Sequence, residues 1–479
     1  MLMGVENTAS LPMLLLSRRH QQGGVYVDSR RRAYPAYVHV SASTRFGHED
    51  LSHGPLFSAV EALDQRTRRP GAARWSLTSV VFQALLMVLE EGQSLNDRFI
   101  NARACYVGMF PGVRRPGKTY QGFIKRQREI CPAMVDAMMA QLRDTHRRIT
   151  GKHEKRFGWT AFACDGSRVE APRTSKNQAA FGCAGKDKTG PQLALTTLYH
   201  MGTGLPWNWR IGAGTEAERS HLRAMLRTLP EGALIVADAG FTGYDLLNEI
   251  IGGGRSFLIR AGSNVRLLTN LLDVKVQQNG DVVWLWPQGR RDHPPLTLRL
   301  IRLGRRKGSG SQEQMCLLTN VFDRERMSPE IAASLYEMRW GVEVFYRAFK
   351  RTLDQHKLRS DAPEQAKWEL QWAMMAFLLL GLMTVEGILE RGRDPLSMSV
   401  AGALRVVRQA MRHPQRCWRR RGDLRVLLAQ ACKDEYVRTS SKKARDWPHK
   451  KKEGPPGLPQ MRPATEHESR LAERTCAAA

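Results

Sequence analysis

The fold is most constrained by a series of strand and helix patterns between residues 159 and 260. At its centre, residues 233–237 read Ala-Leu-Ile-Val-Ala, a continuous apolar run that is typical of a strand buried on both faces. Three strand patterns precede this run and a helix and a strand follow it, at 161–167, 193–200, 207–212, 242–251 and 256–260. We therefore expect an α/β domain in which helices cover a mixed sheet.

Helical patterns dominate the first third of the chain. Residues 1–72 are rich in Ser, Arg and Gly, and predict a mobile basic N-terminal region. Residues 73–150 predict helices, including one over about 120–148, with a basic loop near Arg114 and Arg115. This region is predicted to bind DNA ends, and the simpler alternative is a plain helical bundle.

The predicted secondary structure changes several times in the second half of the chain. Residues 261–325 are strand-rich and predict a β-rich insertion. Pro329 then opens a long predicted helix with Ser328 as its cap, and a buried helix is expected over 364–390. Residues 391–441 predict a basic helical region, and the proline-rich basic segment 442–479 predicts a disordered tail.

The net charge restricts the partners. A formal charge of +28 and a pI near 10.3 call for a polyanion, most commonly nucleic acid, with an anionic membrane surface as the lesser alternative. The apolar run over 372–385 is short for a membrane span and normal for a buried helix. We expect a soluble cytoplasmic protein that associates with the nucleoid and not with a membrane.

One helical face between residues 336 and 350 combines charges of both signs. Tyr336, Arg339, Glu343 and Lys350 fall within a sector of about 60° on an α-helix. A carboxylate can hold a divalent metal, while the cations and the phenol can hold phosphates beside it. The pattern predicts a grip on a nucleic-acid backbone around a metal ion.

Two aspartates are candidates to join Glu343. Asp165 lies in or just after a predicted strand, and Asp238 ends the apolar run at 233–237. If the two strands are neighbours, three carboxylates would meet, and they need a cation to stay ionised together. Oxygen ligands favour Mg²⁺ or Mn²⁺, and two such ions would suit phosphodiester chemistry.

Each acid also has a simpler interpretation. Asp238 can be only a turn or helix cap, and Asp165 before Gly166 can be an Asx turn. Glu343 alone can be a solvated helix residue. The combination of the three favours the metal site.

These motifs resemble those of the DDE transposases of bacterial insertion sequences. Residues 336–350 match the Tyr-(2)-Arg-(3)-Glu-(6)-Lys signature that marks one branch of this family, the insertion sequence four type. Asp165 in Asp-Gly-Ser and Asp238 in Asp-Ala-Gly-Phe match its first and second acidic motifs. The family also places a β-rich insertion before its third acid, as expected here at 261–325.

The resemblance implies a fold and an activity. Residues 158–390 would form an RNase H-like catalytic domain with Asp165, Asp238 and Glu343 as the catalytic, metal-binding triad. Tyr336, Arg339 and Lys350 would bind DNA. The enzyme would cleave double-stranded DNA at transposon ends and join the 3′-hydroxyl ends to target DNA, as a homodimer on paired ends.

The resemblance also raises the question of a stacking aromatic. In this family the cleaved end passes through a hairpin or flipped-base intermediate, which needs an aromatic partner. Trp284 or Trp286 could serve, although a role in the β-domain core is the favoured interpretation. Trp340 is expected to pack its own helix.

Two other functions stay open. The chain could be a catalytically silent relative that binds DNA as a regulator, although the intact acids disfavour this. It could also be an RNase H-like nuclease that cleaves without joining strands.

Overall fold

The computed structural model describes residues 75–110, 114–184, 190–273, 281–306, 312–412, 424–433 and 457–478 of the 479-residue chain. The mobile region expected at 1–72 lies outside this part, as do residues 442–456 of the expected tail.

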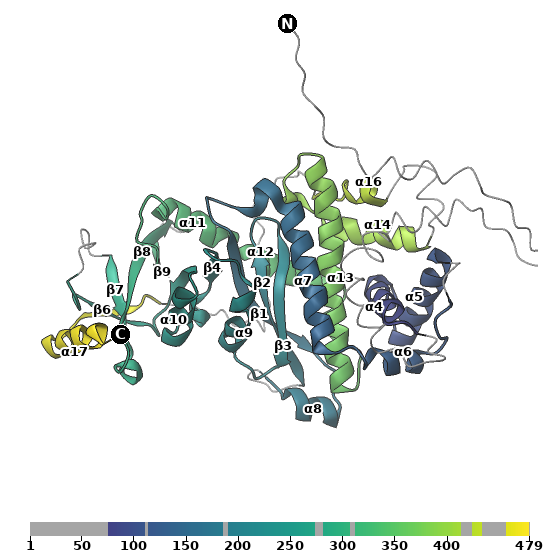
Figure 1. Cartoon of the computed structure of the whole chain (residues 1–479), viewed down its shortest axis with the longest axis horizontal. Helices are drawn as coiled ribbons and strands as arrows, with labels where there is room; N and C mark the ends of the chain where they lie inside the picture. The colour runs from purple at the N-terminus through teal and green to yellow at the C-terminus, as the bar shows by residue number, and fades with distance from the viewer. Residues whose placement is uncertain are drawn as a thin grey trace, which may run out of the picture.

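A mixed sheet forms the middle of the molecule (Figure 1). β1 (Ala161–Glu170), β2 (Gln192–His200) and β3 (Leu205–Ala213) make an antiparallel meander. β4 (Leu234–Ala237) and β5 (Ser256–Ala261) continue it on the other side of β1, parallel to β1. The resulting order β3-β2-β1-β4-β5 is the RNase H-like arrangement, so the predicted fold class is confirmed.

The β-rich insertion extends this same sheet. β9 (Gln312–Thr319) pairs antiparallel with β5, and β8 (Leu296–Arg306), β7 (Val282–Leu285) and β6 (Arg266–Thr269) follow outward. With a last strand beside β6, the sheet has ten strands in all. The insertion therefore shares one hydrogen-bonded sheet with the strands that precede it.

The strands alternate between two hydrophobic cores, one on each face of the sheet. Phe162 and Ile235 lie in one core, while Ala163 and Val236 lie in the other, and all four are 0% exposed. β4 is thus covered on both sides, as its unbroken apolar sequence predicted.

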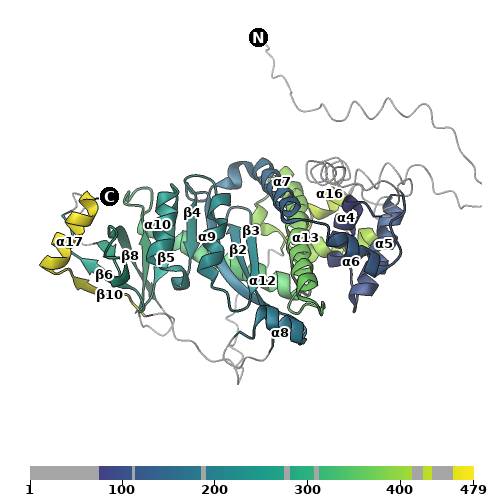
Figure 2. The same ribbon diagram turned by 60° about the horizontal axis from the view of Figure 1, so that its bottom comes forward.

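Different helices cover the two faces (Figures 1 and 2). α9 (Glu218–Met225) and α10 (Tyr244–Gly252) bury Leu222 and Leu247 in the core that holds Phe162. α11 (Pro329–Met338), α12 (Trp340–Arg351) and α13 (Pro363–Glu390) bury apolar side chains in the core that holds Ala163. The short elements between them are α8 (Ser175–Phe181), η2 (Gly151–Glu154), η3 (Leu226–Thr228), η4 (Ala239–Phe241), η5 (Gln288–Arg290) and η6 (Pro395–Ser397).

The helical region that precedes the sheet consists of α4 (Leu77–Leu89), α5 (Leu95–Met109), α6 (Tyr120–Gln127) and α7 (Pro132–Thr150). The single helix expected over about 120–148 is therefore two helices. Pro132 explains the break, because proline disfavours a helical conformation in the residue before it and is tolerated in the first turn of a new helix. After α13 the described chain adds α14 (Val400–Arg412) and α16 (Leu424–Leu428).

The long helix α13 lies in the core that holds Ala163. It is long and apolar enough to cross a membrane, but 78% of its apolar window is buried inside the protein. Leu370, Phe377 and Val385 are among its buried residues. The sequence-based expectation of a buried core helix at 364–390 is confirmed.

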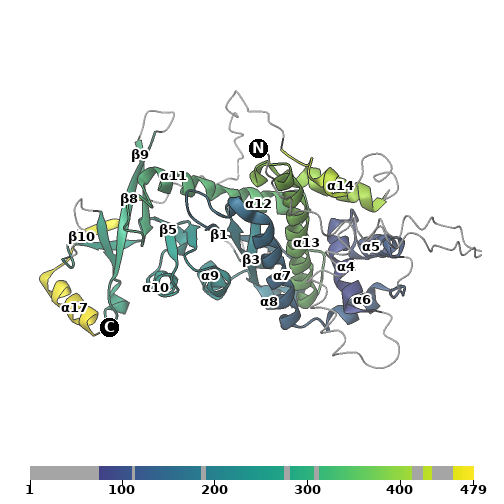
Figure 3. The same ribbon diagram turned by 45° about the horizontal axis from the view of Figure 1, so that its top comes forward.

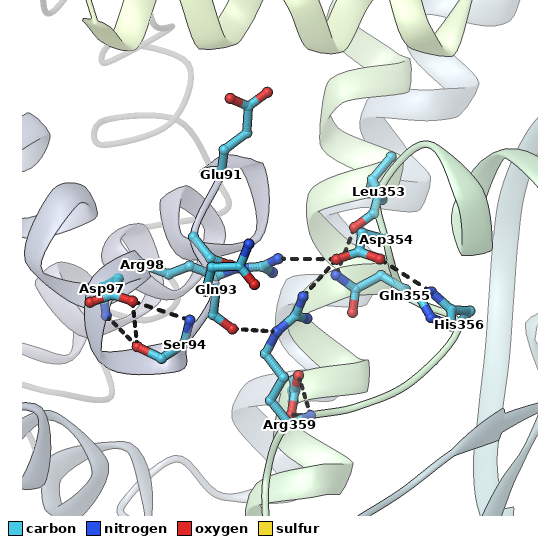
Figure 4. Close-up of polar contacts among 12 residues, drawn as sticks. Glu91, Gln93, Ser94, Asp97, Arg98, Leu353, Asp354, Gln355, His356 and Arg359 are labelled. Carbon is cyan, nitrogen blue, oxygen red and sulfur yellow. Dashed lines mark hydrogen bonds and ion pairs between the residues drawn. The ribbon is translucent and has the colours of Figure 1, made fainter.

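An ionic cluster ties the N-terminal helices to the connection between α12 and α13 (Figure 4). Arg98 at the start of α5 is 5% exposed and forms an ion pair with Asp354 at 3.6 Å. Arg359 donates to the same carboxylate at 2.6 Å and to the Gln93 carbonyl at 3.1 Å. One aspartate thus holds two arginines from segments far apart in the sequence.

The helix expected to run from Pro329 through Lys350 is divided at Arg339. Ser328 caps α11 as predicted, accepting a hydrogen bond from the Ile331 amide. At the junction the amide of Arg339 donates both to the Leu335 carbonyl, as in an α-helix, and to the Tyr336 carbonyl, as in a 3-10 helix, each at 3.3 Å. Just beyond it, the backbone of Gly341 packs against the ring of Tyr199, where a Cβ would lie 3.0 Å from the ring.

The expected disorder of residues 442–479 is wrong for the part that the structure describes. β10 (Gln460–Pro463) pairs with β6, and α17 (Glu466–Ala477) buries Ala472 in the core beneath the insertion. The segment is ordered because a distant strand edge satisfies its backbone.

Glu468 is the anchor of this C-terminal unit, and replacing it tests the anchor. Its carboxylate accepts hydrogen bonds from Arg462 at 2.6 Å and Arg291 at 2.8 Å, and Arg462 first of all holds the pKa of Glu468 down to about 2. We expect Glu468→Gln to loosen α17 by about 2 kcal/mol, seen as faster limited proteolysis of the C-terminus. Glu466→Gln, on the exposed side of α17, is the control.

The same carboxylate gives a pH dependence. Because its pKa is lowered on folding, its stabilising effect is complete above about pH 4.5 and is lost as the pH falls toward 2. Equal proteolysis of wild type and Glu468→Gln at pH 7 would contradict the anchoring role.

Candidate active site

The two candidate aspartates lie one residue beyond a pair of residues that are in register on neighbouring parallel strands. Cys164 of β1 is in register with Ala237 of β4, so Asp165 and Asp238 are the next residues along each strand. Each carboxylate also accepts a hydrogen bond from the backbone amide that follows it, at 2.9 Å and 2.8 Å. The turn-forming role and the adjacency of the two acids are therefore both present.

The α11–α12 pair lies across these strand ends. The Tyr336 hydroxyl donates to Asp238 Oδ1 at 3.1 Å, and Arg339 Nη2 donates to Glu343 Oε1 at 3.0 Å. Further along α12, Lys350 Nζ donates to the Arg168 carbonyl at 2.7 Å, which fixes this end of the helix on β1. All six residues singled out from the sequence thus lie on β1, at the end of β4, or on the two helices that contact these strands.

Arg339 is the central cation of the site. Its side chain is 11% exposed, and its buried Nε has no hydrogen-bond partner in the described part of the chain. Burial alone would lower the pKa of Arg339, but Tyr336 and the three acids Asp238, Glu343 and Asp165 raise it above the ordinary value. One guanidinium thus compensates three carboxylates.

The carboxyl group of Asp165 has a raised pKa. Burial raises the pKa of its carboxyl to about 6, while the Gly166 amide and Arg339 oppose the rise. Two further carboxylates, Glu218 and then Glu343, add to it. Asp165 is therefore an acid whose charge is only partly compensated by the protein.

Glu218 was not selected from the sequence as a site residue. It lies in the first turn of α9, and its carboxylate packs directly on Gly166, where a Cβ would lie 2.2 Å from Glu218 Cδ. Glu216, two residues earlier, is instead bound to His221 and to the Ala213 amide. The sequence signal was an acid opening the helix after the third strand, but many helices begin with such an acid.

Asp165, Asp238 and Glu343 do not lie close enough together to form a metal site. Among the described residues, no group of three His, Cys, Asp or Glu side chains lies close enough together to hold a metal ion. Glu343 is engaged by Arg339, which supplies the positive charge. The donor set still fits a hard divalent cation, because it consists of carboxylate oxygens around a buried carboxyl that lacks full compensation.

The tryptophans separate clearly into buried and exposed. Trp284 and Trp286 are 0% and 3% exposed, so the interpretation as β-domain core is confirmed. Trp340 is 52% exposed, so the expectation that it packs its helix is wrong. It precedes Glu343 by one helical turn, and Val344 on the same helix is also exposed. The face of α12 beside Glu343 therefore presents an indole to solvent.

Comparison with known proteins gives concordant results. The transposase DDE domain family matches residues 157–379. The transposase InsG of insertion sequence element IS4, from Escherichia coli (strain K12), is 28% identical over 246 residues. This match covers 48% of the present chain and 53% of InsG, so the chain spans about half the length of that relative.

A solved structure is also similar, with a TM-score of 0.39 and 11% identity: the piggyBac transposase synaptic complex with hairpin DNA. The likeness covers 87% of this chain and 89% of that one. The fold assignment rests on the strand order and not on this likeness.

The matched segment contains all three candidate acids and the Tyr-Arg-Glu-Lys signature. Domains of this family use a divalent metal, which agrees with the carboxylate donor set. The resemblance inferred from the sequence motifs is confirmed by the family match and by InsG. Residues 157–379 of this chain are therefore similar to the transposase DDE domain family, and part of the chain is similar to the IS4 transposase InsG.

Proposed function

We propose that the protein is a DNA transposase that cleaves DNA at transposon ends and transfers the 3′-hydroxyl ends into target DNA by in-line phosphoryl transfer. The observation that supports the proposal is that Asp165 on β1, Asp238 directly after β4, and Glu343 on α12 all act on the charge of the same residue, Arg339. Acids on three separate elements that act on one arginine need further positive charge to function together.

Asp165, Asp238 and Glu343 would hold the divalent metal, Mg²⁺ or Mn²⁺, as two ions per site. When bound, the metal would activate an attacking hydroxyl and stabilise the leaving oxygen. Glu343 must leave Arg339 to join the two aspartates, and this frees the guanidinium. Arg339 is then available to a DNA phosphate, beside Tyr336 and Lys350, and the bidentate fork of arginine suits that partner.

The substrate would be double-stranded DNA, at both transposon ends and target. The net charge of +28 supports a polyanionic partner. A homodimer on paired ends is part of the proposal, because each transposon has two ends to be processed together.

Removing one acid tests the active site. Asp238→Ala should abolish metal-dependent nicking of end DNA, by a factor of roughly 10³ or more, while end binding is kept. The measurement is single-turnover nicking with Mg²⁺ or Mn²⁺, beside a gel-shift assay without metal. The control is Asp245→Asn, which should nick normally. Asp245 is a surface acid of α10 that forms an ion pair with Arg290.

Nicking by Asp238→Ala at the wild-type rate would refute the triad. A strand-joining assay with a free 3′-hydroxyl end separates the transposase from the alternatives. A nuclease would nick without joining, and a silent DNA-binding relative would do neither.

Glu218 supplies a second test. Because its carboxylate packs on Gly166 beside Asp165, we expect Glu218→Gln to weaken Mn²⁺ binding roughly tenfold, as loss of a supporting carboxylate does in other metal sites. Manganese electron paramagnetic resonance measures this without any catalytic readout. Glu216→Gln, two residues before Glu218, is the control and should bind Mn²⁺ normally. Equal Mn²⁺ affinities of wild type, Glu218→Gln and Glu216→Gln would exclude a role for Glu218.

Trp340 is the proposed aromatic partner of an unpaired base at the cleaved end. Trp340→Ala should cost about 1–3 kcal/mol in affinity for end DNA that carries one unpaired base, and much less for fully paired DNA. Trp340→Phe keeps an aromatic ring and should retain most of the preference for DNA with an unpaired base. Val344→Ala, one turn along α12, is the matched control. Equal losses on both DNAs would mean that Trp340 stacks no base.

A further inference from the structure

A second concave surface lies away from the acids, along the outer edge of β3. It is a groove of about 940 Å³ between the first half of α7, η3, β3 and the start of α13. In the figures α7 and α13 run side by side next to β3 (Figures 1 and 3). β3 is the last strand on this side of the sheet, so its outer edge has no strand partner among the described residues.

The groove is distinct from the candidate active site. None of the three acids lines it, and β2 separates β3 from the strand that carries Asp165. Whatever binds there does not compete directly for Asp165, Asp238 or Glu343.

Its walls are strongly basic. Five cationic side chains line the groove against two acidic ones, Asp136 and Glu364. None of these five side chains has a hydrogen bond or an ion pair within the described parts of the chain. They are Arg128, Arg143, Arg210, Arg227 and Lys367.

Arg143 is a half-buried cation of this groove. Burial first of all lowers the pKa of its guanidinium, and the charges of Arg147 and Arg227 act in the same direction while Asp144 and Asp136 oppose them. A concave surface on which cations outnumber carboxylates favours an anionic ligand.

The floor of the groove is apolar and aromatic. Trp209 and Met139 are buried in it, and the half-buried Trp368 stacks on Trp372 with ring centroids 5.4 Å apart. Cationic walls over an aromatic floor suit single-stranded nucleic acid, whose bases are free to contact rings while its phosphates meet the cations. A duplex keeps its bases stacked inside and would use only the walls.

We propose that this groove binds a short single-stranded segment of DNA. The inference rests on the proposed function for the origin of the strand, which would be an unpaired stretch at an opened DNA end. The groove thereby gives the enzyme a second DNA contact whose chemistry does not depend on the metal.

The test is fluorescence anisotropy of a labelled oligo-dT strand with the full-length protein, in EDTA, over a range of salt concentrations. The groove variant is Arg210→Gln/Arg227→Gln, two exposed arginines whose replacement leaves no buried partner. The matched control is Arg266→Gln/Arg405→Gln, two exposed arginines on β6 and α14 outside the groove. A duplex of the same length and poly-glutamate are the competing ligands.

We expect the groove variant to lower the slope of log affinity against log salt by about 1.4, for two lost phosphate contacts on a single strand. The control pair should change this slope by much less. Trp368→Ala should weaken oligo-dT binding several-fold without altering the slope, because it removes a base contact and no charge.

Three results would overturn the proposal. These are equal losses in the groove and control pairs, a loss confined to duplex DNA, or displacement of oligo-dT by poly-glutamate as readily as by unlabelled oligo-dT. Asp238→Ala is carried through the same assay and should bind like wild type. A failure of the triad to cleave is therefore distinguishable from a failure of the groove to bind.

Discussion

Charge compensation around Arg339 is the interaction on which the rest of the site depends. Asp165 on β1, Asp238 after β4 and Glu343 on α12 all act on the charge of Arg339, whose side chain is 11% exposed. Without that cation the acids would repel one another in a poorly solvated place, where burial already raises the pKa of Asp165 to about 6. The arginine of the signature therefore has a structural role in the metal-free protein as well as a proposed one toward DNA.

The sheet makes this gathering possible. Parallel pairing of β1 and β4 sets Asp165 and Asp238 side by side, and the meander of β2 and β3 brings α9 back so that Glu218 reaches Gly166. The break at Arg339 then lets α11 present Tyr336 to Asp238 while α12 presents Glu343. Because the insertion continues the same sheet, it supports the strand ends through hydrogen bonds and not through a flexible hinge.

Several features could not be predicted from local sequence patterns, because contacts between residues far apart in the chain determine them. The C-terminal strand β10 is ordered by β6, about two hundred residues earlier in the chain. Glu218 looks like any acid in a first helical turn until its contact with Gly166 is seen. Trp340 was expected to pack, since large aromatics usually do, yet the cores are filled without it.

The sequence by itself determined the class of fold, the positions of the central strands along the chain and the buried nature of α13, and it supplied the candidate acids. These follow from apolar periodicity and from motifs whose spacing is local or strand-terminal. Only the tertiary structure decided that Arg339 interacts with these acids, that Glu218 packs on Gly166 beside Asp165 and that a basic groove follows the edge of β3. Those features arise from side chains of separate elements meeting in space, and their mutual distances are fixed by packing and sheet register, which no single segment encodes.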